Sequence, residues 1–473
     1  MNKNLYKAGI ALALMTIATT SCDDFLDLKP ESTASTVNFY TGENDLNNAV
    51  ISCYAKLQSG DLYGGDLITL LETRSDNIED QNPGGNAGRD YNIDKFTAGA
   101  DNAVFRDVWK ASYNTIMRCN TVLANLDVLE GKPSKLQFEG EARFIRALMY
   151  FNLVRMWGDV PLILSPITTS EAVNVTRDPI SDVYKAIEED LRIAKFQLPS
   201  VYNDESKKGR ATSGAASALL GKVYLTQKKW AECRDLLCDF ITTEYKNTYA
   251  LVNPVAKIFN ADNKLNPEMV FVVRYEKSIV DEGRSFPTYY KSAQLLDPNL
   301  RKLYATTPSR DERLALLESN KVDSDNSPFV KFYDTFDPLT QKVGFDQPII
   351  RYSDVLLMYV EALNEIEYNP SPRGDAFYYL NLIRTRSKAP TYTPATLKDQ
   401  ESFREAVLLE RRLEFPLELH RWFDLIRTET AEAALAKVGI NITRNDYLYP
   451  IPKSELELIN NPGFYQNPGY ENK

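Results

Sequence analysis

The sequence predicts a helical frame that carries long irregular loops. Three observations indicate this fold class. Apolar residues recur at the i, i+3, i+4 and i+7 spacing of an amphipathic helix in several long segments. One segment contains the pattern L-G-x-x-Y, which is typical of the first helix of a tetratricopeptide repeat. Two other stretches, rich in Pro, Asn, Asp and Tyr, lack a helical period, and such long loops are usually functional or disordered.

The first 21 residues have the pattern of a signal peptide. Two lysines precede the apolar run Ala8–Thr19, which is shorter than the roughly 20 apolar residues of a membrane-spanning helix. Cys22 comes next, and it resembles the lipidated cysteine of a bacterial lipobox, although Thr19 stands where that motif usually has leucine. We therefore predict lipidation of Cys22 after removal of residues 1–21. An ordinary secretory peptide cut near Ser21 is the alternative.

Two acidic residues stand directly after the predicted lipid. Asp23 and Asp24 in this position resemble a signal that, in some Gram-negative lipoproteins, directs export to the outer face. We expect a lipid-anchored protein of the cell outer membrane that is exposed at the surface. The net charge of −10 disfavours nucleic acid as a partner, because such binding depends on cationic neutralisation of phosphates.

Four helices are expected before residue 200. Their apolar stripes span Glu43–Gln58, Asn102–Leu129, Lys135–Trp157 and the segment from Pro179 to Phe196. Gly158 and Pro161 end the third, because glycine and proline commonly follow the last turn of a helix.

The later helices are expected in pairs. The segment Ser217–Leu237 holds the L-G-x-x-Y pattern, in which Gly221 would let the paired helix approach closely. Two further pairs are Asp354–Ile366 with Asp375–Lys388, and Phe403–Phe415 with Arg421–Val438. The pairs are not evenly spaced at 34 residues, so a simple solenoid is excluded.

Charged and aromatic side chains within these helices are interpreted as structural. Planar guanidinium groups suit bidentate carboxylate pairs between packed helices. The arginines in question are Arg143, Arg146, Arg155, Arg411, Arg412, Arg421 and Arg427, and they lie among acidic residues of the same segments. All four tryptophans, Trp109, Trp157, Trp230 and Trp422, also fall in helical segments and are expected to pack.

The irregular stretches supply the candidate binding residues. A sugar needs an aromatic ring against its apolar face and planar polar groups for its hydroxyls. In the first stretch, Gly60–Ala100, the candidates are Asp76, Asn77, Arg89 and Tyr91; in the second, about Tyr245 to Ile350, they are Arg284, Phe286, Tyr289, Tyr290 and Tyr333. We expect Gly60–Ala100 and Tyr275–Phe345 to meet in space as one exposed face. The alternative is that each ring anchors its own loop.

Few residues are available for catalysis. His420 is the only histidine, which disfavours a His-based catalytic triad and a His-rich metal site. The G-x-S-x-G motif of many serine hydrolases does not occur either. Cys53, Cys119, Cys233 and Cys238 are expected to be free thiols, and neither a metal nor another cofactor is expected. Two alternatives stay open: a glycan-degrading enzyme that uses a carboxylate pair, and an adaptor that binds a peptide or protein.

Several phrases in a fixed order resemble one family. They include "CDDFLDLKPES", "ETRSDN" (Glu72 to Asn77), "GEARFIRALMYFNLVRMWGDVPLI" (Gly140 to Ile163), "RYSDVLLMYVEALNE" (Arg351 to Glu365), "LLERRLEFPLELHRWFDLIRT" (Leu408 to Thr428) and "LYPIPKSELELINNPGFYQNPGY" (Leu448 to Tyr470). The chain is similar over almost its whole mature length to the SusD/RagB family, surface lipoproteins that work with TonB-dependent transporters.

This resemblance implies an all-α fold with four tetratricopeptide-like helix pairs and a loop-rich ligand-binding face. It divides the chain into residues 22–245 and 246–473, the latter irregular over 246–350 and helical over 351–440, all within one unit. It also implies a non-catalytic protein that captures an oligosaccharide and delivers it to a SusC-like transporter. The sequence leaves open which glycan is bound, and whether the ligand is a peptide.

Overall fold

The computed structural model describes residues 40–280, 282–284, 294–305, 311–317, 329–332, 334–459 and 461–470. Its α-helices are α3 (Glu43–Leu57), α4 (Asp66–Ile68), α5 (Arg89–Asp94), α6 (Ala103–Ala124), α7 (Ser134–Trp157), α8 (Thr169–Ala172), α9 (Ile180–Gln197), α10 (Ser213–Thr226), α11 (Trp230–Asp239), α12 (Pro298–Ala305), α13 (Leu314–Leu317), α14 (Tyr352–Ile366), α15 (Asp375–Arg386), α16 (Gln400–Glu414), α17 (Arg421–Arg427), α18 (Ala431–Ala436) and α19 (Lys453–Leu458). The strands β1 (Ile78–Asp80), β2 (Met269–Val273), β3 (Gln294–Leu296) and β4 (Gln347–Arg351) pair antiparallel as β1–β3 and β2–β4. The prediction of a helical frame with loops is confirmed.

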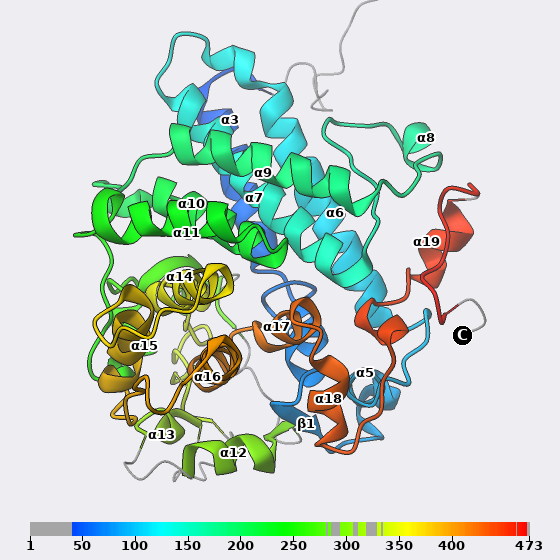
Figure 1. Cartoon of the computed structure of the whole chain (residues 1–473). Helices are drawn as coiled ribbons and strands as arrows, with labels where there is room; N and C mark the ends of the chain where they lie inside the picture. The colour runs from blue at the N-terminus through cyan, green and yellow to red at the C-terminus, as the bar shows by residue number, and fades with distance from the viewer. Residues whose placement is uncertain are drawn as a thin grey trace, which may run out of the picture.

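The long helices pack in succession. In Figure 1, α3, α6, α7 and α9 lie in the upper half, α10 and α11 lie to the left of α6, and α14, α15 and α16 lie lower. Each of α3, α6, α7, α9 and α10 contacts the next, and α14 contacts α10 and α11. This order fits tetratricopeptide-like pairing, which itself stays a prediction.

Local signals fix the helix ends. Asn102 begins α6, because its side chain accepts the backbone N–H of Val104 at 3.0 Å. Gly158, at φ 74°, ends α7 as expected. The single helix expected over Arg421–Val438 is wrong: it breaks into α17 and α18, because Glu429 adopts φ 59° between them.

Gly221 lies where α10 and α11 approach closely. A Cβ atom at this position would lie 2.6 Å from Leu237 Cδ2, well inside van der Waals contact. The close approach expected from the L-G-x-x-Y pattern is therefore present, and Gly221 permits it.

A cluster of buried ions occupies the C-terminal half; we call it the charge lattice. It contains Arg313, Lys331, Arg351, Arg384, Arg386, Glu268, Asp311, Glu410, Glu414 and Glu418, all buried. Arg351 is central: it contacts Glu268, lies 2.9 Å from Glu414 and 2.6 Å from Glu418. Every guanidinium and ammonium group in the lattice is matched by a carboxylate, as burial of charge requires.

The arginines singled out from the sequence are structural too. Arg411 lies 2.8 Å from both Asp354 and Asp424, and Arg146 lies 2.8 Å from Asp190. Arg155 is the exception to carboxylate pairing. Its guanidinium lies between the rings of Phe151 and Phe423, at 3.6 and 3.5 Å from their centres, and burial lowers its pKa to about 10.

The tryptophans and cysteines lie as expected. Trp109, Trp157 and Trp422 are buried, and Trp230 packs half-buried against the same core. Cys53, Cys119 and Cys233 are buried free thiols, and Cys238 is half-buried and free.

Candidate ligand-binding face

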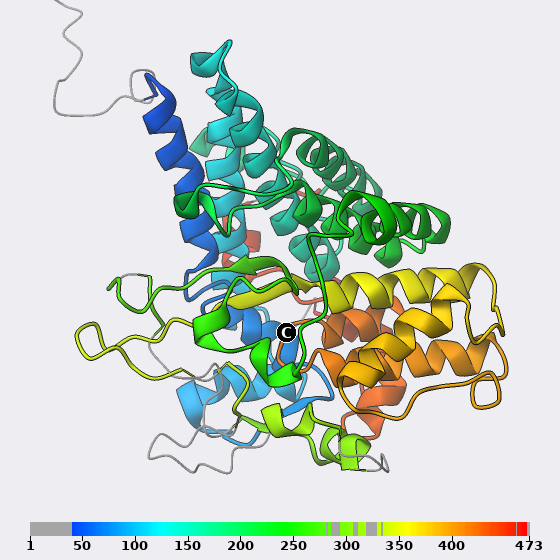
Figure 2. The same cartoon turned by 90° about the vertical axis from the view of Figure 1, so that its left-hand side faces the viewer.

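The two irregular stretches meet in space. Strand β1 of the first pairs with β3 of the second, and the backbone N–H of Asp297 donates to Asn77 O at 2.9 Å. Arg284 Nη2 donates to the backbone oxygen of Tyr63, also at 2.9 Å. We call the described residues of 60–100 and 275–345 the loop face. For these residues the expected meeting of the two stretches is confirmed, and Figure 2 shows their loops at the lower left, away from α9 and α10.

A buried clamp holds the first stretch in place. It consists of Glu72, Arg74, Asp76 and Asn77 of the "ETRSDN" phrase. Glu72 accepts the backbone N–H of Leu419, a residue in the left-handed region at φ 66°. Arg74 donates to the backbone oxygen of Asp446 at 2.8 Å. The clamp thus ties the loop face to the C-terminal part of the chain.

The side chains of Asp76 and Asn77 are buried within the loop face, whereas the sequence predicted them as ligand-binding groups on its exposed surface. Asp76 accepts two hydrogen bonds from Arg421, at 2.7 and 2.9 Å, and Arg412 lies 3.0 Å away. Burial acts to raise its pKa, but the Arg421 and Arg412 guanidinium groups hold that pKa below its usual range. Asn77 accepts from Arg412 Nε at 3.1 Å. Both side chains therefore brace the loop. Their partners Arg412 and Arg421 come more than 330 residues later in the sequence, so no local pattern could indicate this role.

Arg89 and Tyr91 lie on the outer part of the loop face, in α5. Arg89 bonds Asp66 and Asp90, both at 2.9 Å, and keeps 28% of its side chain exposed. Tyr91 is half-buried, and Lys95 Nζ lies 5.6 Å from its ring centre. Lys95 in turn lies 3.3 Å from Glu79 of β1. This corner offers one ring together with cationic and anionic partners, which is the combination that a hydroxyl-rich ligand needs.

A strained turn precedes this corner. Asn86 and Ala87 adopt φ 50° and 57°, and Gly88 follows at φ 78°. Left-handed conformations of residues other than glycine cost free energy and persist only where neighbouring structure enforces them. The turn positions Arg89 at the start of α5.

Arg284 braces the second stretch. It is buried, it pairs with Val343 as an isolated β-bridge, and its guanidinium lies 3.6 Å from the centre of the Tyr275 ring. The other candidates of this stretch, Phe286, Tyr289, Tyr290 and Tyr333, lie outside the described residues. Cys22 does as well.

Family models match both halves of the chain. The model described as "SusD family" matches residues 328–470, and the one described as "Starch-binding associating with outer membrane" matches residues 24–225. The chain belongs to the SusD/RagB family.

Relatives support this membership over nearly full length. SusD-like protein P25 of Formosa agariphila is 26% identical over 93% of this chain and 94% of its own. A SusD-like protein of Bacteroides ovatus is 25% identical over 87% and 82%. A solved structure named as a laminarin-binding SusD-like protein has 27% identity and a TM-score of 0.75, and covers 91% of this chain and all of its own. A SusD-like carbohydrate-binding protein of Bacteroides fragilis, 24% identical with a TM-score of 0.76, shares the fold.

Membrane-spanning helices and metal-binding clusters are both absent from the described part of this SusD/RagB chain. Within the described ranges, every helix is too short or too polar to cross a membrane. In the same ranges, no three His, Cys, Asp or Glu side chains are grouped so as to hold a metal ion.

The buried carboxyl of Glu72 in the clamp should make the stability of the fold depend on pH. Burial raises the pKa of Glu72 from 4.5 to about 7. A carboxyl whose folded pKa is raised stabilises the fold fully below pH 4.5, and this contribution is lost as the pH rises towards 7. Glu72→Gln keeps the acceptor for Leu419 without the charge. We therefore expect the variant to gain up to about 3 kcal/mol over the wild type at pH 8, but almost nothing at pH 4.5.

Urea unfolding at both pH values measures this difference. Glu79→Gln, at a partly exposed position of β1, is the control and should follow the wild type. An equal effect of Glu72→Gln at the two pH values would contradict the assignment.

Proposed function

We propose that this SusD/RagB protein binds an oligosaccharide at the cell surface without cleaving it and delivers it to a SusC-like TonB-dependent transporter. Cys22 would carry the lipid that holds the chain to the outer membrane. The loop face would hold the glycan, and the transporter would supply the energy for import.

The likeness to the laminarin-binding protein carries this proposal, because it exceeds 25% identity over nine-tenths of the chain. The family description that names starch binding and the outer membrane points the same way. The loop face adds a physical reason, since Tyr91, Arg89 and Lys95 combine a ring with charged hydrogen-bond donors at a partly exposed corner.

The environment of His420 favours binding over catalysis. The ring is buried, and Lys222 Nζ donates to its Nδ1 at 2.7 Å. Burial, reinforced by the Lys222 charge, lowers the pKa of His420 to about 3. The only histidine of the chain is therefore neutral near pH 7 and enclosed in the core, where it cannot reach a substrate.

A glycan array with the mature protein, followed by calorimetric titration of the hits and a reducing-end assay, tests the proposal. We expect binding in the micromolar to millimolar range and no released product. Product formation that a single Asp or Glu substitution abolishes would place the protein among the enzymes. Binding of peptides but no glycan would favour the adaptor alternative.

Tyr91→Ala is expected to weaken glycan binding about tenfold. Losing an aromatic contact and its burial costs roughly 1–2 kcal/mol, and 1.4 kcal/mol is a factor of ten. Tyr378→Ala is the matched control, because Tyr378 is an exposed tyrosine on α15, outside the loop face. Calorimetric titration of both variants beside thermal melts makes the comparison. Unchanged affinity in Tyr91→Ala would remove this corner from the site.

Cys22→Ala is expected to release the protein from membranes or to leave residues 1–21 uncleaved. The physical reason is that acyl chains contribute on the order of 0.8 kcal/mol per buried methylene. Membrane fractionation and mass spectrometry of the mature N-terminus measure the outcome. A wild-type chain that begins elsewhere and carries no acyl mass would refute the anchor.

A further inference from the structure

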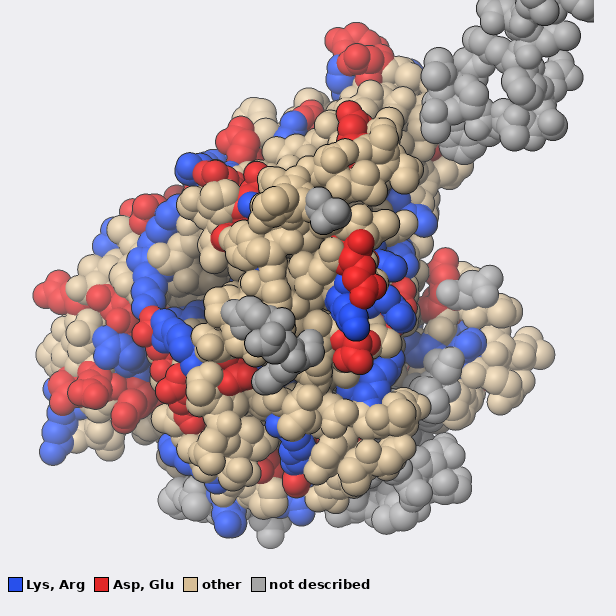
Figure 3. All heavy atoms as spheres, turned by 90° about the vertical axis from the view of Figure 1, so that its right-hand side faces the viewer, with Lys and Arg blue, Asp and Glu red and all other residues tan. Residues whose placement is uncertain are grey.

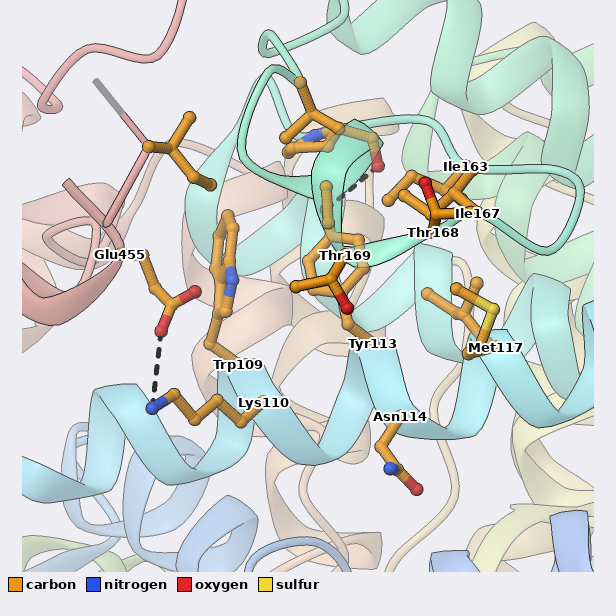
Figure 4. A pocket seen from close by; sticks show the side chains of 15 residues that line it. Trp109, Lys110, Tyr113, Asn114, Met117, Ile163, Ile167, Thr168, Thr169 and Glu455 are labelled. Carbon is orange, nitrogen blue, oxygen red and sulfur yellow. Dashed lines mark hydrogen bonds and ion pairs between the residues drawn. The ribbon is translucent and has the colours of Figure 1, made fainter. Parts of the chain in front are cut away.

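A surface pocket lies beside α6 and is lined by residues outside the loop face. Its volume is about 380 Å³, within the range of ligand-binding pockets. Figure 4 shows Trp109, Tyr113 and Met117 of α6 along one wall. Ile163 and Ile167 of the loop after α7, together with Thr169 of α8, lie along the other.

The lining of this pocket suits apolar side chains. Aliphatic and aromatic residues form most of it, and the Lys110–Glu455 ion pair, at 3.6 Å, closes one end. The Tyr113 hydroxyl is already bonded to the backbone oxygen of Pro161 at 2.9 Å. Trp109 is only 3% exposed and packs against Trp157, so it offers no free ring face for a sugar.

The pocket lies within reach of the N-terminal segment. The described chain begins at Tyr40, and Glu43 of α3 lies 3.7 Å from Lys132, just beyond the C-terminal end of α6. From Met117 to that end α6 rises only about 10 Å at 1.5 Å per residue. The twelve residues from Tyr40 back to Leu28 span up to about 40 Å when extended.

The pattern of residues 22–39 matches this pocket. Three large apolar residues, Phe25, Leu26 and Leu28, lie within four positions in "CDDFLDLKP", interrupted only by Asp27. Figure 3 views the molecule from the side on which α8 and α19 lie, and uncharged side chains cover much of its upper half. A segment that crosses this surface contacts few charged side chains. Its apolar residues can pack in the apolar pocket.

We propose that Phe25 and Leu28 of the N-terminal segment occupy the pocket between α6, α8 and α19. Docking there stabilises the segment through burial of apolar surface, which scales with the area removed from water. It shortens the free tether to the few residues between Cys22 and Phe25. Docking would also hold the lipid beside α6 and fix the orientation of the protein over the membrane, a consequence that rests on the lipid proposed at Cys22.

The test uses the full-length lipidated protein in detergent. An aspartate-specific protease cleaves the segment before Asp27, and mass spectrometry follows the rate. Thr169→Trp fills the pocket mouth, since Thr169 lines it, while Ser170→Trp on the same short helix lies outside the lining and is the control. We expect Thr169→Trp and the Phe25→Ser, Leu28→Ser double variant each to speed cleavage about tenfold or more, because cleavage reports the opening free energy.

Combining the two changes separates this proposal from others. If the segment fills the pocket, the combined variant is cleaved no faster than either parent, since both remove one interaction. Additive effects, or a wild-type segment cleaved as fast as the variants, overturn the proposal. Protection that rises with protein concentration would assign the pocket to a second copy of the chain and overturn it as well. None of these outcomes depends on glycan binding.

Discussion

Arg351→Met is expected to lower the free energy of unfolding by about 3–5 kcal/mol, the usual cost of breaking a buried ion pair by removing one partner. Arg351 is 1% exposed and bonds Glu268, Glu414 and Glu418 within the charge lattice. Methionine fills similar space, but it removes the positive charge that pairs with Glu268, Glu414 and Glu418. Urea unfolding at pH 7 measures the loss.

The loss should shrink in acid. Burial acts to raise the pKa of Glu418, but Arg351 and Lys331 hold it below its usual range. Such a group stabilises the fold above its unfolded pKa of 4.5, and the contribution is lost as the pH falls. Without Arg351 the carboxyl accepts a proton at higher pH, so the difference between wild type and variant should be smaller at about pH 4 than at pH 7.

Arg404→Met is the matched control. Arg404 pairs with Glu365 at 2.5 Å on the outside of α16, with 38% of its side chain exposed. An exposed pair contributes about 0–1 kcal/mol, so the control should change little. Equal losses in the two variants would mean that the lattice contributes no more than a surface pair.

Trp157→Ala is expected to destabilise the fold by about 3–5 kcal/mol through the cavity it leaves. Trp157 is fully buried, packs edge-on against Trp109 at 5.2 Å between ring centres, and donates to Pro450 O at 2.9 Å. Its removal also leaves that carbonyl without its donor.

Thermal and urea unfolding of Trp157→Ala measure the loss. Trp230→Ala, at a half-buried tryptophan that begins α11, is the comparison and should cost clearly less. At temperatures where Trp157→Ala remains folded, glycan affinity should match the wild type. Reduced affinity in the folded variant would connect this core position to the site.

The helical frame could be predicted because its signals are local. Apolar spacing, the Asn102 cap and the Gly158 terminator each act within one or two turns. Helix α7 keeps its expected bounds to within one residue, whereas α6 ends at Ala124 and not at Leu129. Gly221 was identified from the L-G-x-x-Y pattern, in which the glycine lets the paired helix approach closely. The break at Glu429 was missed, since no proline or glycine marks it.

The site was predicted less completely because its determinants are distant in sequence. A polar run in a loop is typical of an exposed surface, and nothing near Asp76 reveals that Arg421 and Arg412 cover it. The environment of Arg155 was not predicted either. Its guanidinium packs between the rings of Phe151 and Phe423, and no acidic residue nearby in the sequence indicates this contact. The meeting of the two stretches was predictable from composition alone, and ligand binding by Arg89, Tyr91 and Arg284 stays a prediction.

The clamp has a consequence for the order in which the chain folds. Asp76 pairs with Arg421, which comes 345 positions later in the chain, and Arg74 bonds Tyr470, which comes 396 positions later. Contacts closing such long loops form late, because ordering the intervening chain must come first. The N-terminal helices can assemble early, whereas the first loop stretch stays unanchored until Arg412, Arg421 and Asp446 have been added. A chain interrupted before Arg412 is therefore expected to keep its N-terminal helices and to leave the clamp of the loop face open.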